Sequence, residues 1–256
     1  MDKIKYFEEL YNILKDGINK KLQLIEQQKG CIPRIYSSVE SYGESLGILE
    51  FCYKNNIIES KRNFYKSTIA REWTYMAYDQ KKYDIEKGYV TTYVYESLFN
   101  AILCGDKERM IYMANLFGGR IEEEKDDYKP NIMLGYGLKY VILDDKEKAY
   151  EYIKQLEENK DKRGMKQYYN GYYKVYKGII DRDEEIFNDG LLFMLKHHKQ
   201  RMKKNGDTLQ QYFAYDSIAL SMIAKDRGIN INVKHEMLPM EYLEPVDLDY
   251  SEIKLF

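Results

Sequence analysis

The 256-residue sequence is poor in residues that carry much of enzyme chemistry and in residues that break helices. It contains three histidines, three cysteines, four prolines and one tryptophan. The cysteines, Cys31, Cys52 and Cys104, are odd in number and widely spaced, which is typical of reduced thiols in a cytosol and argues against a disulfide framework. With so few prolines, the chain has room for many uninterrupted helices.

No stretch of the sequence has the character of a membrane span or a secretion signal. No apolar run approaches the roughly 20 residues that a spanning helix needs. The first residues, 1–5, lack the apolar core and the small-residue cleavage site of a signal peptide. We therefore expect a cytoplasmic protein with no membrane partner.

The motifs that hold metals, phosphates or activated nucleophiles are also missing. His197 and His198 are neighbours, so on a helix their side chains point about 100° apart and cannot hold one metal from the same face. There is no Cys-x-x-Cys or His-Glu-x-x-His spacing, no glycine-rich phosphate loop and no Gly-x-Ser-x-Gly elbow. The sequence therefore predicts no catalytic residues, no cofactor and no metal site.

The charge balance argues against direct binding of nucleic acid, because domains that bind it are usually strongly basic and this chain has a formal net charge of −2. The 27 tyrosines are the unusual excess. They could form a protein interface, for which tyrosine is well suited, but compositional bias with core packing is the simpler interpretation.

Apolar residues recur at three- and four-residue intervals along most of the chain, which is the pattern of amphipathic helices. One short strand is predicted at 229–233, directly after a helix stop at Gly228. Helices are predicted at residues 2–29, from Ser37 or Ser38 to Tyr53, and at 59–79, 91–104, 107–117, 130–143, 146–158, 163–180, 184–204 and 208–226.

A short motif occurs three times, roughly 40 residues apart, which is within the range of helical solenoid repeats. Each copy has an apolar pair, a tight turn and an aspartate, and the aspartates are Asp106, Asp145 and Asp183. Each aspartate can accept hydrogen bonds from the first free N–H groups of the next helix. The motif predicts helical hairpins, and it leaves open whether they form a regular superhelix.

Glycines at helical spacing predict close helix contacts. Gly43 and Gly47 lie four residues apart, and Gly164, Gly171 and Gly178 are each seven apart, so each set shares one helix face. A glycine inside a helix costs about 1 kcal/mol relative to alanine, which makes sense where another helix packs against it. Packing within the chain is the commoner use of such a face, and contact with a partner is the alternative.

Two segments are strongly acidic. The first contains Glu122, Glu123, Glu124, Asp126 and Asp127, and the second runs from Glu236 to the end of the chain. An acidic surface attracts basic partners and speeds their association. The alternative is a solvated loop and tail.

The last quarter of the chain carries a distinctive pattern. It runs Ile186-Phe187-Asn188-Asp189-Gly190, then Lys196-His197-His198-Lys199, then Ala224-Lys225-Asp226-Arg227-Gly228-Ile229, and closes on Leu238-Pro239. This pattern resembles the immunity 49 family of bacterial polymorphic-toxin immunity proteins. The resemblance is good over residues 183–243 and loose over 60–182, and it implies an all-helical cytoplasmic protein that binds a toxin. No motif of the family identifies the residues that contact the toxin.

These observations together predict an all-α fold of antiparallel helical hairpins, packed in a bundle or a short solenoid-like array, with at most one short C-terminal extended segment. We expect one domain over 1–256, with N-terminal helices at 1–90, hairpin repeats at 91–228 and an extended acidic tail at 229–256.

The expected function is stoichiometric neutralisation of a cognate protein toxin, with a basic nuclease domain as a candidate toxin and the acidic residues of 122–127 as candidate contacts. The alternatives are a TPR-like adaptor that binds a peptide or protein, and an enzyme with an unrecognised site. The sequence does not indicate an oligomeric state.

Overall fold

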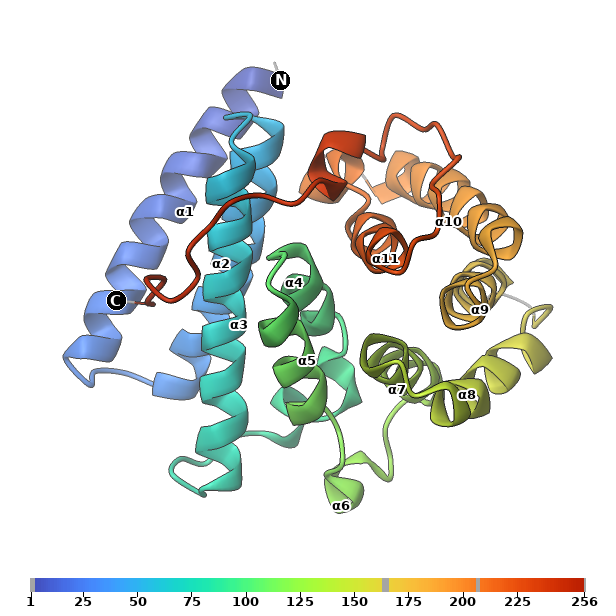
Figure 1. Ribbon diagram of the computed structural model, residues 1–256. Coiled ribbons are helices and arrows are strands. Elements are labelled where there is room, and N and C mark those ends of the chain that lie inside the picture. Colours follow the sequence, from blue (N-terminus) through green and yellow to red (C-terminus); the bar gives the residue numbers. More distant parts are fainter. Residues whose placement is uncertain (1–2, 163–165, 206–207, 256) are drawn as a thin grey trace.

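Helices account for all the regular secondary structure in the residues that the computed structural model describes, which are 3–162, 166–205 and 208–255. The all-α prediction is therefore confirmed. Figure 1 shows three long helices on one side, α1 (Lys3–Glu26), α2 (Ile32–Cys52) and α3 (Ile57–Asp79), with the other helices curving away from them. No helix among the described residues is long and apolar enough to cross a membrane.

The three N-terminal helices pack as antiparallel neighbours around close glycine contacts. A Cβ atom added to Gly43 would lie 2.5 Å from Ser67 Oγ, and one added to Gly47 would lie 2.9 Å from the Phe64 ring. Both glycines thus bring α2 against α3, as their spacing predicts. Asn56 begins α3, because its side chain accepts a hydrogen bond from the N–H of Glu59 at 3.1 Å.

The predicted start of the second helix at Ser37 or Ser38 is wrong. The helix begins at Ile32, where Pro33 occupies the first turn and so costs no hydrogen bond. Ser38 lies inside the helix, and its hydroxyl donates to the carbonyl of Arg34 at 2.9 Å. A serine that bonds back along a helix in this way does not need to cap it.

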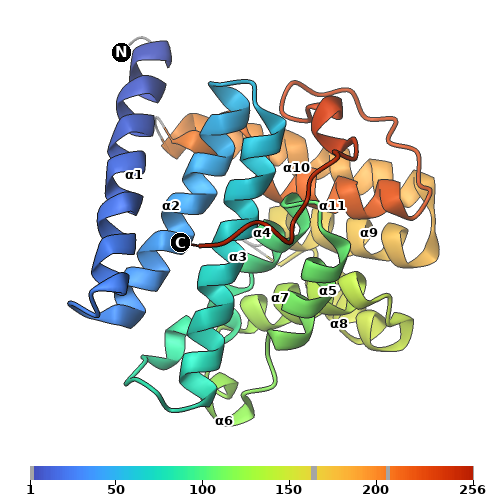
Figure 2. The same ribbon diagram turned by 60° about the vertical axis from the view of Figure 1, so that its left-hand side comes forward.

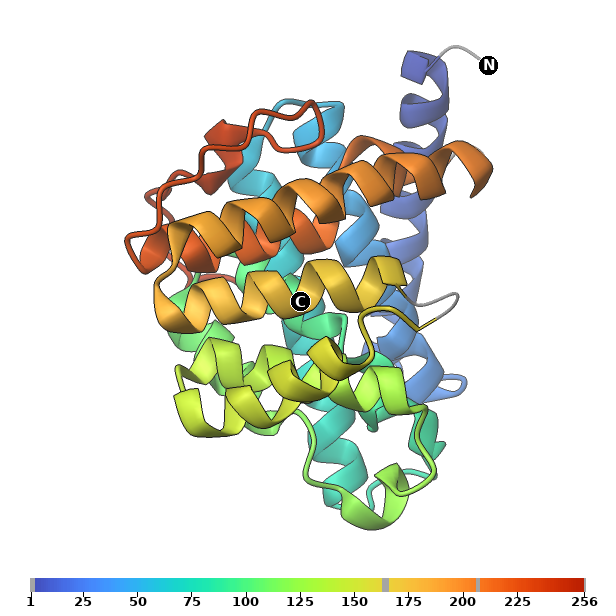
Figure 3. The same ribbon diagram turned by 90° about the vertical axis from the view of Figure 1, so that its right-hand side faces the viewer.

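The rest of the chain forms helical hairpins. Figure 3 shows α8, α9 and α10 side by side in successive layers, and α11 packs on α4, α9 and α10. The α-helices are α4 (Ser97–Leu103), α5 (Lys107–Leu116), α6 (Ile121–Glu124), α7 (Lys129–Leu143), α8 (Lys146–Glu158), α9 (Lys166–Asp181), α10 (Glu184–Asn205) and α11 (Tyr215–Asp226). Short 3-10 helices occur at η1 (Lys87–Tyr89), η2 (Thr92–Val94), η3 (Leu209–Tyr212) and η4 (Met240–Leu243).

Three further predictions of secondary structure are wrong, and one short helix was not predicted. The helices predicted at 91–104 and 208–226 are each divided into a 3-10 turn and a shorter α-helix, and α6 falls in a stretch where no helix was predicted. Residues 229–233 form no strand. Instead, Asn188 of α10 bonds this extended segment through its side chain, donating to Asn230 O at 2.9 Å and accepting from Asn232 N at 2.8 Å. A side chain of α10 thus takes the place of a partner strand.

The glycines of α9 lie against α10. A Cβ atom added to Gly178 would lie 2.6 Å from Phe187 N, and one added to Gly171 would lie 2.5 Å from Met194 Cγ. The interpretation that this face packs within the chain is confirmed at these two positions. Gly164, the third glycine, lies outside the described residues.

Two apolar clusters fill the interior, and Trp73 of α3 borders both. The indole of Trp73 stacks on Tyr36 with ring centroids 3.7 Å apart and planes 3° from parallel. The last described segment crosses α3 on the outside (Figures 1 and 2), and its residues 253–255 line a cavity with Tyr36 of α2 and Trp73 of α3. Its Leu255 is only 6% exposed and belongs to the same cluster as Phe7 of α1.

Candidate partner-binding site

The acidic segment at 122–127 divides into residues that hold the fold and residues that face solvent. Glu124 is buried, and it accepts hydrogen bonds from Tyr136 Oη at 2.6 Å and from the N–H of Arg120 at 3.3 Å. Asp127 accepts from the N–H and the hydroxyl of Thr92 at 2.8 Å and 2.6 Å. These two carboxylates anchor α6 to η2 and α7.

The other three carboxylates of the segment lie at the surface. Glu123 accepts a hydrogen bond from Tyr78 Oη at 2.8 Å, which lowers the pKa of its carboxyl. The side chains of Glu122 and Asp126 are 86% and 71% exposed. The Nζ of Lys125 lies 3.7 Å from the Glu122 carboxylate, and that of Lys87 lies 4.0 Å from the Asp126 carboxylate. Glu122 and Asp126 are therefore the two members most available to a partner.

The three repeated aspartates lie at the turns of the hairpins. Asp106 accepts from the N–H of Glu108 at 3.0 Å, Asp145 from Lys148 at 3.2 Å and Asp183 from Ile186 at 2.9 Å. Each side chain thereby satisfies one of the free N–H groups at the start of α5, α8 or α10.

The hairpin turns meet at one edge of the molecule, where ion pairs join them. Asp144 ends α7 with its backbone in the left-handed conformation, and its carboxylate pairs with Arg182 at 2.7 Å and with Arg227 at 3.1 Å. The hydrogen bond from Arg182 lowers the pKa of the Asp144 carboxyl. Gly228, with φ of +79°, ends α11 at the same edge, where a residue with a Cβ would be strained.

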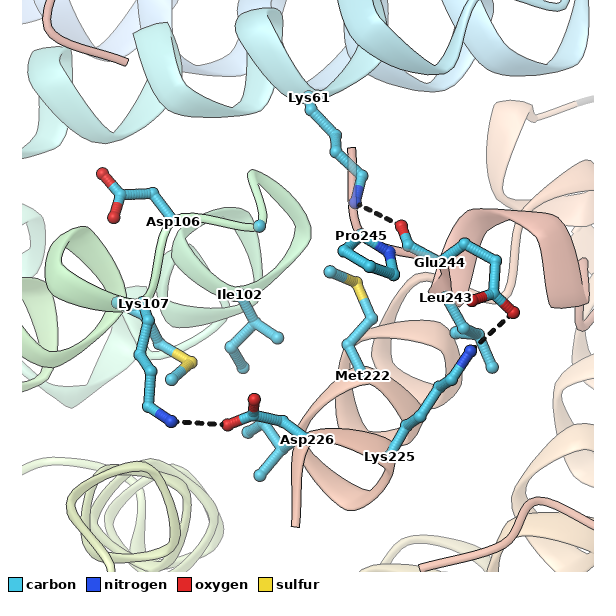
Figure 4. A pocket seen from close by; sticks show the side chains of 13 residues that line it. Lys61, Ile102, Asp106, Lys107, Met222, Lys225, Asp226, Leu243, Glu244 and Pro245 are labelled. Atoms are coloured by element: carbon cyan, nitrogen blue, oxygen red, sulfur yellow. Dashed lines mark hydrogen bonds and ion pairs between the residues drawn. The ribbon is translucent and has the colours of Figure 1, made fainter. Parts of the chain in front are cut away.

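Two adjoining cavities run along this edge, and we call them together the turn groove. Their volumes are about 400 Å³ and about 410 Å³, and both are lined by Lys107, Met110, Ile223 and Asp226. The first cavity lies among α3, the α4–α5 turn, α11 and η4, as Figure 4 shows. The second continues past the α7–α8 turn to Arg182.

Lys61 of α3 supplies a buried positive charge to the wall of the first cavity. The residue is 2% exposed, and its Nζ donates to the backbone carbonyl of Glu244 at 3.2 Å. Burial lowers the pKa of this ammonium group. No carboxylate among the described residues forms an ion pair with it, and its contacts are with the neutral Glu244 carbonyl and the ring of Tyr242.

Arg71, two to three turns further along the same face of α3, shows the contrasting arrangement. Its guanidinium donates to both carboxylate oxygens of Glu40, with Nε 2.8 Å from Oε1, and to the carbonyl of Tyr89 at 2.6 Å. Burial alone would lower the pKa of Arg71, but Glu40 raises it. Of the two buried cations on this face, the one that lines a cavity is the one without a counterion.

The sequence analysis missed Lys61, although a signal for it exists. Lys61, Phe64, Thr68, Arg71 and Tyr75 follow helical spacing and are all buried in the structure. A charged residue in register with Phe64 and Tyr75 indicates a cation on an inward face. The turn groove itself depends on segments far apart in the sequence, so spacing within one helix does not reveal it.

The histidines and cysteines are dispersed. His198 is buried and its Nε2 lies 2.6 Å from the carbonyl of Gln210, and burial raises the pKa values of the Cys52 and Cys104 thiols to about 12. Within the described ranges, no group of three or more histidine, cysteine, aspartate or glutamate residues is placed to hold a metal ion.

Comparison with known proteins gives one result. The family model described as Immunity protein 49 matches residues 93–242, which is more than half of the chain and extends from η2 to η4. The helices α1 to α3 precede the matched region. Searches of curated proteins and of solved structures give no match.

Proposed function

The chain belongs to the immunity protein 49 family, and we propose that it binds a cognate bacterial toxin domain in the cytoplasm and neutralises it by stoichiometric association. The observation that carries this proposal is the family match, which spans the hairpins and most of the residues that line the turn groove. Lys61 and residues 243–245 of the first cavity lie outside the matched region. Binding needs only a complementary surface, so the proposal assigns the protein no catalytic step.

The test is a titration of toxin activity. The genes next to this one would first be searched for a toxin domain. That domain would be purified and mixed with increasing amounts of the protein, with an unrelated toxin domain as the control. We expect activity to fall linearly to zero at a fixed molar ratio and the control to stay active. Protection at far below one equivalent would indicate enzymatic destruction of the toxin, and failure to protect at any ratio would contradict the assigned function.

We further propose that the toxin is a nuclease with a basic substrate cleft, and that the acidic surface near α6 speeds the encounter. Charges at an interface rim mainly change the association rate and its salt dependence. The double variant Glu122→Gln with Asp126→Asn removes the two exposed carboxylates and leaves the bonds of Glu124 and Asp127 in place.

The measurement is stopped-flow association at two salt concentrations. We expect the double variant to associate more slowly than the wild type at low salt and to depend less on salt. A matched control, Glu147→Gln with Glu151→Gln, removes two exposed carboxylates from α8. An equal effect of the control pair would mean that only the net charge matters. Unchanged association of the double variant would show that the surface near α6 does not contribute to the encounter.

A further inference from the structure

We propose that the first cavity of the turn groove receives an acidic side chain of the toxin, whose carboxylate pairs with Lys61. This inference rests on the proposed function and names one contact of it. It concerns a different surface from that of α6, and a contact of the opposite sign.

Lys61 is the one lysine of the cavity wall for which no ion pair is found among the described residues. Lys107 pairs with Asp226 at 2.9 Å, and Lys225 pairs with Glu244 at 2.6 Å. The remaining carboxylate of the wall, Asp106, accepts the capping hydrogen bond from the N–H of Glu108 and is directed away from Lys61 in Figure 4. Figure 4 shows both pairs on the rim, and it shows the Lys61 ammonium directed to the backbone of Glu244.

A buried charge without a counterion is costly, and a carboxylate brought in by a partner would offset that cost. One carboxylate balances one ammonium. A phosphate group would bring more charge than this cavity compensates, since its other lysines are already paired. The single ammonium group without an ion pair therefore favours an aspartate or a glutamate as its partner.

The rest of the lining indicates that this acidic residue has an apolar neighbour. The walls between the charged groups are apolar, and Met110 and Met222 can adjust to an irregular shape because their side chains are unbranched and flexible. These apolar lining residues are Ile102, Met110, Met222, Ile223, Leu243 and Pro245.

The size of the groove fits a protein segment. A cavity of about 400 Å³ is larger than one carboxylate side chain, and the second cavity continues from it past the Lys107–Asp226 pair. A loop or helix of the toxin could place its acidic residue against Lys61 and run along the hairpin turns. This contact would form after the encounter and would mainly control dissociation.

The first experiment compares the wild type with Lys61→Met in binding to the toxin domain encoded beside this gene. Methionine keeps the length of the side chain and removes the charge. We expect roughly 30-fold weaker binding, mostly through faster dissociation, because removing one partner of a buried charge pair has this order of effect. Lys154→Met removes an exposed lysine from α8 and is the control, and we expect it to bind like the wild type.

The second experiment finds the partner carboxylate. Each aspartate and glutamate of the toxin would be changed to its amide and combined with Lys61→Met in a double-mutant cycle. We expect one toxin position whose effect disappears in the Lys61→Met background. If every toxin carboxylate acts independently of Lys61, the inference is wrong.

The outcomes separate the two proposals. If the wild type fails to bind the toxin, the proposed function is wrong, and the inference falls with it. If the wild type and Lys61→Met bind equally, only the groove contact is wrong. Should Lys61→Met fail to fold, Met222→Trp would fill the cavity from α11, and normal toxin binding by that variant would contradict the groove contact.

Discussion

Among single residues, Glu44 of α2 has a carboxyl whose protonation changes near neutral pH. Burial raises the pKa of its carboxyl to about 7, and the nearby Glu40 adds to the effect. The side chain of Asn100 donates to it at 3.4 Å. An unfolded glutamate loses its proton near pH 4.5, so between pH 4.5 and about 7 the folded state binds more protons than the unfolded state.

It follows that Glu44 makes the free energy of unfolding fall as the pH rises through this window. We expect Glu44→Gln, which mimics the protonated acid, to be more stable than the wild type at pH 8 and to show a smaller difference at pH 5. Melting temperatures across the range would measure this. The lowered pKa of His235 acts in the opposite sense, but it is common to both proteins and cancels in the difference.

The cap at Asp145 provides a second prediction for a single residue. Asp145→Ala removes the acceptor for the N–H of Lys148 and should lower the free energy of unfolding by about 0.5–2 kcal/mol. Asp145→Asn retains a capping acceptor and should stay close to the wild type. Denaturant unfolding of the two variants would measure the difference, and an unchanged Asp145→Ala would show that the cap does not stabilise α8.

At the scale of helices, the contact between α9 and α10 distinguishes two glycines. The Cβ of Gly178→Ala would meet the backbone of Phe187, so the helices must separate, whereas that of Gly171→Ala meets the movable side chain of Met194. We expect Gly178→Ala to cost about 1–3 kcal/mol and Gly171→Ala to cost less.

Denaturant unfolding would again provide the measurement. Gly88→Ala is the control, because a Cβ there has no atom within 4 Å. Equal stabilities for Gly178→Ala and Gly171→Ala would mean that moving the backbone of α10 costs no more free energy than moving one of its side chains.

The helices were predicted well where the spacing of residues on one helix face was sufficient to identify them. The hairpins and the glycine faces follow from local spacing and turn chemistry, both of which act over a few residues. The division of 91–104 and the missing strand at 229–233 involve contacts with distant groups, such as Thr92 with Asp127 and Asn188 with Asn230. The start of α2 was misplaced for a local reason, because Ser38 bonds back along the helix and Pro33 occupies its first turn.

The candidate site was predicted less completely than the fold. Charge density marks residues 122–127, but it cannot distinguish Glu122, which faces solvent, from Glu124, which bonds Tyr136. Lys61 lies in a cavity built by α3, the α4–α5 turn, α11 and η4. Such a site exists only once these segments have packed together.

At the scale of the whole molecule, the two ends of the described chain share one apolar cluster. Leu255 lies in it with Phe7, and it lines a small cavity with Tyr36 and Trp73. Leu255→Ala should therefore lower the stability by about 2 kcal/mol. Ile13 of α1 is 67% exposed, so Ile13→Ala is the control and should change the stability little. Thermal unfolding would show whether the C-terminal segment belongs to the cooperative unit.

The stacked pair of Trp73 and Tyr36 also equips the protein with its own optical probe. Trp73 is the single indole among 27 tyrosines, so light at the red edge of the absorption band excites it alone. Its emission depends on both apolar clusters and on the segment that ends near Leu255. Lys61 lies twelve residues away on the same helix, roughly 18 Å along its axis. The fluorescence of the unlabelled protein should therefore report unfolding of the interior without responding directly to what fills the turn groove.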